Sequence, residues 1–166
     1  GITIYHGDCR DYFSEMEAGG YRVDVVITDP PYGARTHAGA RTGDIGDKVL
    51  VDFAYVEADQ FVQDCTRLVS LTERWVVMTC EWRYIHLLET VGLVRFGVWI
   101  KPNGAPQFTG DRPATGWEAV AILHRTGKMR WNGGGHHATW TIPKVEGEHP
   151  TVKPMRLVKD FVRLFS

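Results

Sequence analysis

An apolar run that ends in an acid and two prolines constrains the fold of this chain more than any other stretch. Residues 23–28 read VDVVIT and are followed by Asp29-Pro30-Pro31-Tyr32. A run so rich in Val and Ile is typical of a strand covered on both faces in a parallel sheet. The prolines hold the following backbone extended and stiff, because each restricts the residue before it. This pattern predicts a buried strand that ends in a rigid polar corner.

Other segments alternate between strand and helix patterns. Strands are predicted at 2–5, 74–80, 94–100 and 117–124, and helices at 11–17, 53–71, 82–91 and 154–165. Alternation of this kind is typical of an α/β layered fold. In open α/β sheets, ligands bind beyond the carboxyl ends of the strands. The corner at 29–32 is therefore either a structural turn or a site for a flat polar ligand, and its position favours the site.

Composition limits the class of protein. The chain has 166 residues with 43% hydrophobic and 23% charged residues, as in ordinary globular domains. No apolar run approaches the roughly 20 residues of a membrane-spanning helix, so no membrane contact is expected. The net charge of −1 means that any nucleic-acid surface must be a local patch. Three widely spaced cysteines argue against a disulfide framework and favour a reducing compartment.

Three segments resemble one family. TDPPYG, residues 28–33, resembles the catalytic motif of the S-adenosylmethionine-dependent DNA amino-methyltransferases. EHPTVKPMRLVKDFVRLFS, residues 148–166, is similar to that family's His-Pro-Thr-x-Lys-Pro segment and the helix after it. IYHGDCRDYF, residues 4–13, is a weaker match to its opening Gly-Asp segment, and the order of the three is that of the β class.

The resemblance implies an α/β, Rossmann-like methyltransferase fold, with a mostly parallel sheet and flanking helices. Residues 1–166 would form a single, partial methyltransferase domain. Within it, about 102–147 would supply inserted loops and a target-recognition region. The implied setting is the cytoplasm of a bacterium, or a phage-encoded protein acting there.

The resemblance also assigns chemistry to the corner, with Asp29, Pro30, Pro31 and Tyr32 as its catalytic residues. Asp29 and the Pro30 carbonyl would accept the two hydrogens of an exocyclic base amine, and Tyr32 would stack on a base swung out of duplex DNA. Asp rather than Ser before the prolines favours adenine N6 as the target. Cytosine N4, RNA, protein glutamine and a non-catalytic nucleic-acid-binding remnant stay open as alternatives.

For the cofactor S-adenosylmethionine, the resemblance implies two groups of contacts. Asp8 and Cys9 would lie on its adenine side, and His149, Thr151 and Lys153 near its sugar or methionine end, with Asp29 beside the reacting methyl. A plainer interpretation makes Asp8 a turn residue and Thr151 a helix cap.

The chain departs from the family in one respect. The glycine-rich turn that cradles the methionine part of the cofactor would be expected after Ser166, and Gly133–Gly135 is no substitute because no Val/Ile-rich strand precedes it. We therefore expect residues 1–166 alone to bind S-adenosylmethionine weakly. A missing C-terminal half or a second copy in a homodimer would complete the pocket.

Target contact is expected from cations and aromatic residues between the two main motifs. The candidates for contact with double-stranded DNA are Arg35, Arg41, Arg125, Lys128, Arg130, Trp131 and His136. A solvated basic loop is the alternative. No metal site is expected, since His136-His137 lacks a third ligand at suitable spacing. Cys80 follows Thr79 rather than a proline, which argues against a cytosine-C5 nucleophile and favours a core position.

Overall fold

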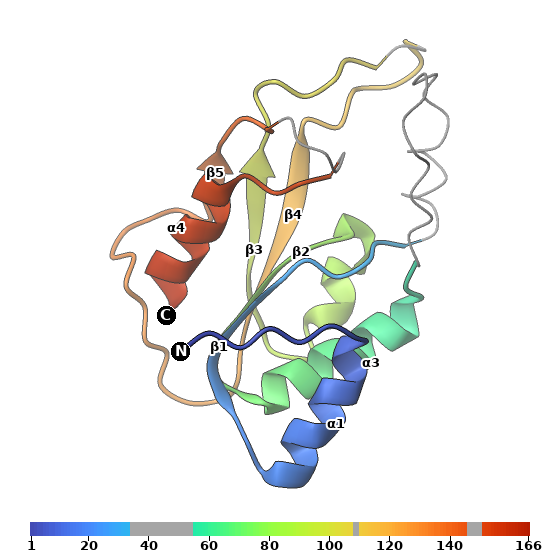
Figure 1. Cartoon of the computed structure of the whole chain (residues 1–166). Coiled ribbons are helices and arrows are strands. Elements are labelled where there is room, and N and C mark those ends of the chain that lie inside the picture. Colours follow the sequence, from blue (N-terminus) through green and yellow to red (C-terminus); the bar gives the residue numbers. More distant parts are fainter. Residues whose placement is uncertain (34–54, 108–109, 146–150) are drawn as a thin grey trace.

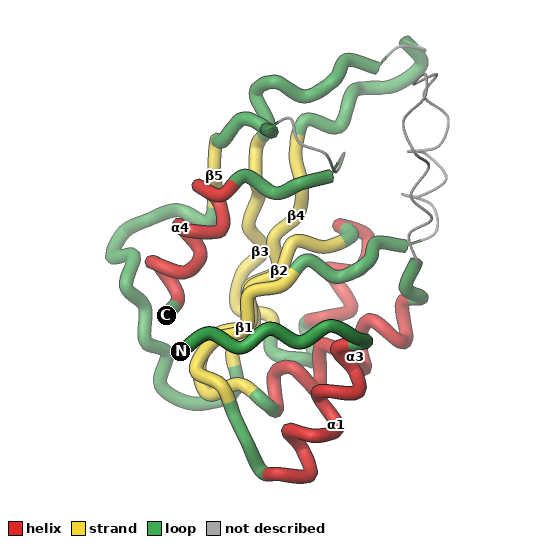
Figure 2. Tube along the Cα trace, viewed as in Figure 1, coloured by secondary structure: helices red, strands yellow, loops and turns green. Residues whose placement is uncertain are grey.

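The computed structural model describes residues 1–33, 55–107, 110–145 and 151–166 (Figure 1). Its elements, in chain order, are α1 (Cys9–Gly19), β1 (Val23–Thr28), α3 (Ala58–Ser70), β2 (Thr72–Cys80), the 3₁₀ helix η1 (Trp82–Leu88), β3 (Leu93–Ile100), β4 (Trp117–His124), β5 (Thr139–Thr141) and α4 (Met155–Phe165). Figure 2 shows the strands grouped at the centre, with helices on both sides.

The strands form one mixed sheet in the order β1-β2-β4-β3-β5. β1 runs parallel to β2 and β3 parallel to β5, whereas β4 is antiparallel to both of its neighbours. Four of the five described strands therefore run in the same direction, as expected for a mostly parallel sheet, and β4 alone is reversed. β4 follows β3 with no helix between them in the described part of the chain, and such a connection produces antiparallel neighbours.

Two apolar layers enclose the sheet. On one face, which we call the α4 face, residues of β2, β3, β4 and β5 pack with Leu157, Phe161, Leu164 and Phe165 of α4. On the other face, α3 and η1 cover β2 and β4 through Phe61, Cys65 and Leu88. β4 is central and covered on both sides, which explains why its sequence is apolar at nearly every position.

α1 begins and ends at residues that its sequence indicates, and α4 has the buried face that its sequence indicates. Asp8 caps α1 by accepting a hydrogen bond from the Arg10 amide, and Gly20 ends the helix in the left-handed region at φ 66°. In α4, Leu157, Phe161 and Leu164 recur at helical spacing and are all buried. The spacing of these apolar residues therefore predicted which side of α4 packs against the sheet.

Several expected elements differ from the structure. Residues 2–5 form no strand, and Ile2 and Ile4 are exposed, because no neighbouring strand pairs with them in the described part of the chain. The helix expected from residue 53 begins at Ala58, and the one expected over 82–91 is a 3₁₀ helix. The range 102–147, expected to supply inserted loops and a target-recognition region, includes two strands of the sheet, β4 and the short β5. Its role in target recognition stays a prediction.

No helix among the described residues is long and apolar enough to cross a membrane. Nor do three or more His, Cys, Asp or Glu side chains in the described ranges gather in a way that would hold a metal ion.

Candidate functional site

Polar residues replace the core at one edge of the α4 face. This is the carboxyl edge, where β1, β2 and β3 end and where β4, running the opposite way, begins. Side chains two residues apart on a strand lie on the same face. Ile27, Val77 and Val120 pack in the core of the α4 face. Asp29, Thr79 and Glu118 each lie two residues from one of these, toward the carboxyl edge of the sheet.

The Asp29 carboxylate is held from two sides. The Thr79 hydroxyl donates a hydrogen bond to Oδ1, and the Lys153 ammonium lies 2.8 Å from Oδ2. The Asp29 side chain is nevertheless 42% exposed. Because a carboxylate has about four acceptor positions on its two oxygens, Asp29 can still accept hydrogen bonds from a ligand.

Glu118 lies behind Asp29 and is the centre of the charged group. Its Oε2 accepts a hydrogen bond of 2.8 Å from the Tyr32 hydroxyl and lies 3.4 Å from Lys153 Nζ, while Oε1 pairs with Lys101. Burial alone would raise the pKa of Glu118, but the charges of Lys153 and Lys101, with the hydrogen bonds to Glu118, bring this pKa below its ordinary value. Glu118 is therefore a carboxylate at neutral pH.

Tyr32 points its hydroxyl into this group. Burial, followed by the negative charges of Glu118 and Asp29, raises the pKa of Tyr32 above its ordinary value. The phenol thus stays protonated and serves as a hydrogen-bond donor. The Lys153 ammonium lies 5.6 Å from the centroid of the Tyr32 ring, within the range of a cation–π contact.

Of the predicted cofactor residues other than Asp29 itself, the structure brings Lys153 to Asp29. Asp8 caps α1 and pairs with Arg10, whose hydrogen bonds lower the pKa of Asp8 to about 2, and Cys9 is the exposed first residue of the helix. Thr151 is exposed two residues before Lys153. His149 lies outside the described residues. Cofactor contact by Asp8, Cys9, His149 and Thr151 stays a prediction.

The predicted DNA-contacting residues after β4 lie far from Asp29. The Trp75 indole donates a hydrogen bond to the Arg130 carbonyl, and the centroids of the Trp131 and Phe165 rings lie 5.1 Å apart. Trp75 is near the start of β2 and Thr79 near its end, a separation of about 13 Å along the strand. The structure therefore separates the segment 125–137 from the carboxyl edge, although its cations Lys128 and Arg130 are exposed.

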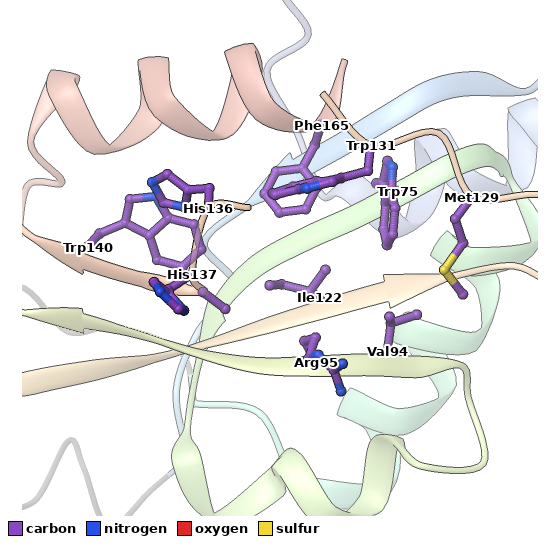
Figure 3. A pocket seen from close by; sticks show the side chains of 11 residues that line it. Trp75, Val94, Arg95, Ile122, Met129, Trp131, His136, His137, Trp140 and Phe165 are labelled. Atoms are coloured by element: carbon purple, nitrogen blue, oxygen red, sulfur yellow. The ribbon is translucent and has the colours of Figure 1, made fainter. Parts of the chain in front are cut away.

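A cavity of about 380 Å³ is lined in part by this same segment (Figure 3). Its walls are largely aromatic, with Trp75, Trp131, Trp140 and Phe165 above a floor formed by Ile122 and Val94. His136 and His137 also line it. The cavity lies on the α4 face, toward the end of the sheet opposite Asp29, so it is not the pocket expected beside the Asp-Pro-Pro-Tyr corner.

Arg35 and Arg41, and the glycine-rich loop that contains them, lie outside the described residues. Arg125 is half-buried directly after β4. DNA contact by the cations, Trp131 and His136 thus stays a prediction.

The structure confirms the expectation for the cysteines at the core. Cys65 and Cys80 are buried in the layer beneath α3 and η1, and the Cys65 sulfur lies 3.7 Å from that of Met78. Burial raises the pKa of Cys80 to about 12, so its thiol carries almost no thiolate at neutral pH. Cys80 is therefore unsuited to act as a nucleophile.

Sequence reasoning missed Thr79, Lys101 and Glu118. A signal for Glu118 was present: it is a lone acid inside WEAVAILH, an otherwise apolar strand, and a buried charge requires a partner. Thr79 and Lys101 gave no comparable signal, because a threonine is ordinary in a strand and a lysine is ordinary after one.

No protein-family model matches the chain, and no curated protein matches it in sequence. Solved structures share its fold, among them two of M1.HpyAVI. The M1.HpyAVI–SAM complex is 21% identical with a TM-score of 0.66, over 100% of this chain and 78% of that chain. M1.HpyAVI is 18% identical with a TM-score of 0.67, over 100% of this chain and 76% of that chain. The likeness confirms the α/β, Rossmann-like methyltransferase fold, here with a mixed sheet.

Proposed function

We propose that this chain carries the catalytic corner of an S-adenosylmethionine-dependent DNA methyltransferase that acts on the N6 amine of adenine. The observation that carries the proposal is the placement of Asp29. It follows β1 at the carboxyl edge, is held by Thr79 and Lys153, and stays partly open to a ligand. The structural neighbour M1.HpyAVI, solved with SAM, supports the choice of cofactor.

The residues at this edge fit part of the cofactor. The Lys153 ammonium suits a carboxylate, and the Thr151 hydroxyl, exposed two residues earlier, suits a hydroxyl or amine. We propose that these two residues hold its methionine or sugar end. S-adenosylmethionine supplies an activated methyl group when it is bound.

The chemistry of the corner follows from the target amine. The lone pair of an exocyclic base amine is delocalised into the ring, so the amine is a poor nucleophile. Asp29 and the Pro30 carbonyl accept its two hydrogens, which draws the nitrogen toward a tetrahedral form with its lone pair aimed at the methyl group. The positive charge that develops on nitrogen is stabilised by the Asp29 carboxylate. Catalysis thus depends mainly on positioning and electrostatics.

Pro31 and Tyr32 complete the corner. The two prolines fix the backbone that carries the Pro30 carbonyl. Tyr32 offers a ring that is held at its hydroxyl by Glu118, and a base swung out of the duplex would stack on it.

Double-stranded DNA is the proposed partner. The loop after β3 begins at the carboxyl edge of the sheet, where β1 also ends (Figure 1). We propose this loop as the nearer contact to the target base. Lys128 and Arg130 would then contact backbone phosphates farther along the duplex.

The test is methyl transfer by the full-length protein. The protein is incubated with labelled S-adenosylmethionine and duplex DNA, RNA or protein, and the digested DNA is analysed for N6-methyladenine and N4-methylcytosine by mass spectrometry. We expect label in N6-methyladenine of DNA. Label only in RNA, in protein or in N4-methylcytosine would contradict the proposal.

Asp29→Ala tests the site itself. We expect the rate to fall roughly 100- to 1,000-fold, as for the loss of one group that stabilises developing charge. The matched control is Asp24→Ala, an exposed acid on the same strand that lies away from the corner. Turnover retained in Asp29→Ala would remove Asp29 from the mechanism.

A further inference from the structure

We infer that Glu118 is a positioning residue, which fixes both the Asp29 carboxylate and the Tyr32 ring although it touches no substrate. That this positioning matters for catalysis rests on the proposed function. The positioning itself can be tested without activity; we call Glu118 with its partners Lys101, Lys153 and Tyr32 the hub.

The contacts form two branches from one carboxylate. In the first, Glu118 Oε2 lies 3.4 Å from Lys153 Nζ, and that ammonium lies 2.8 Å from Asp29 Oδ2. In the second, the same oxygen accepts the 2.8 Å hydrogen bond from the Tyr32 hydroxyl. Glu118 Oε2, a single atom on β4, thus holds the Tyr32 ring directly and the Asp29 carboxylate through Lys153.

β4 is well suited to serve as the reference. It is the strand between β2 and β3, and Val120 and Leu123 on it are fully buried. Asp29 and Tyr32, by contrast, lie beyond the end of β1, on a segment that is not part of the sheet. Glu118 therefore connects a segment outside the sheet to a central strand that is buried on both faces.

Lys101 completes the hub by balancing its charge. Two lysines and two carboxylates, Lys101, Lys153, Glu118 and Asp29, sum to zero charge. The side chains of Lys101, Lys153 and Glu118 are 16%, 14% and 18% exposed, so they are well shielded from water. Since desolvation offsets much of the attraction in buried ion pairs, such a group contributes little net stability. What it does supply is a defined geometry.

Glu118→Gln in the full-length protein tests the inference. The amide keeps the shape and can still accept from Tyr32, but it removes the charge that holds both lysines. We expect kcat for DNA methylation to fall roughly 100-fold per folded molecule, the cost of a misplacement near 1 Å. The KM for DNA should change less than about threefold, since most DNA affinity comes from phosphate contacts that Glu118 does not make. The KM for the cofactor should rise, because Glu118 holds Lys153, which is proposed to bind the cofactor. The control is Glu73→Gln, an exposed acid near the other end of β2 that pairs with Arg22.

A double-mutant cycle with Tyr32→Phe tests the second branch. Tyr32→Phe keeps the ring and removes the hydroxyl that Glu118 holds. If Glu118 acts partly through Tyr32, the loss from Tyr32→Phe should be about tenfold in the wild type and clearly smaller in Glu118→Ala, which removes the acceptor of the Tyr32 hydrogen bond, because contacting residues couple. Additive effects of the two substitutions would contradict the inference.

A readout independent of activity separates the inference from the proposed function. With 3-fluorotyrosine placed at position 32, the ¹⁹F resonance should shift or broaden in Glu118→Gln and stay unchanged in Glu73→Gln. A wild type that methylates nothing, together with this displaced resonance, would overturn the proposed function and support the hub. An active wild type whose Glu118→Gln variant matches it in kcat and in ¹⁹F spectrum would overturn the hub alone.

Discussion

Removing the Phe161 ring should loosen the helix that brings Lys153 to Asp29. Phe161 is 3% exposed, lies on the buried side of α4 and meets Trp140 edge-to-face with ring centroids 4.9 Å apart. An aromatic side chain buries about 150 Å² or more, and at about 25 cal/mol per Å² this corresponds to nearly 4 kcal/mol. Phe161→Ala should therefore lower the free energy of unfolding by about 4 kcal/mol, within the range of 3–5 for such truncations.

Urea unfolding followed by tryptophan fluorescence and far-UV circular dichroism measures this loss. With a slope near 2 kcal/mol per molar, the midpoint should fall by about 2 M while the slope itself stays constant. Val162→Ala is the matched control, because Val162 is the next residue on α4 and is 47% exposed; its effect should stay within about 0.5 kcal/mol. A loss below about 1 kcal/mol in Phe161→Ala would show that α4 is not packed as described and would refute the reasoning.

Two further predictions concern ionisation. The folded-state pKa of Glu118 lies below its ordinary value of 4.5, so its carboxylate stabilises the fold above that pH, and this contribution is lost as the pH falls through the folded-state value. The difference in unfolding free energy between the wild type and Glu118→Gln should therefore shrink below pH 4.5 in urea titrations; a constant difference would contradict the ion pairs. Among the cysteines, Cys9 is exposed and should react with a thiol reagent in the folded protein, slowly because partial burial and the charge of Asp8 raise its pKa; the buried Cys65 and Cys80 should react only on unfolding. Rapid modification of all three thiols in the folded protein would contradict their burial.

The sequence predicted those parts of the fold that depend on local pattern. The apolar positions of α4 indicated a buried face, and they are buried as expected. The Val/Ile run of β1 indicated a strand covered on both faces, but β1 is an edge strand of the described sheet and its residues are at most partly buried. The reversed direction of β4 was not predictable from local pattern, because the glycine- and proline-rich stretch at 101–116 can cross a sheet or turn back from it. β5 was missed because three residues are too few to show a period.

The candidate site was predictable only where its residues are neighbours in the chain. Asp29 to Tyr32 form a contiguous motif, and Lys153 lies in a second motif. Thr79 and Glu118 come from strands that were interpreted as core, and only the register that sets Thr79 opposite Val120 brings them together. Long-range register depends on the packing of the whole sheet, which no local pattern contains.

The α4 face shows why the polar corner is better explained as a site than as a turn. Its end near the start of β2 is lined by aromatic rings, with Trp75, Trp131 and Phe165 in contact at the wall of the cavity. At the carboxyl edge, the strand positions on this same face carry Thr79 and Glu118 instead. Apolar side chains at these positions would avoid the free-energy cost of desolvating charge. A turn would need only the two prolines, and neither buried lysines nor a carboxylate on the central strand. The charged group is thus in keeping with our proposal that the corner holds a polar ligand in a fixed orientation.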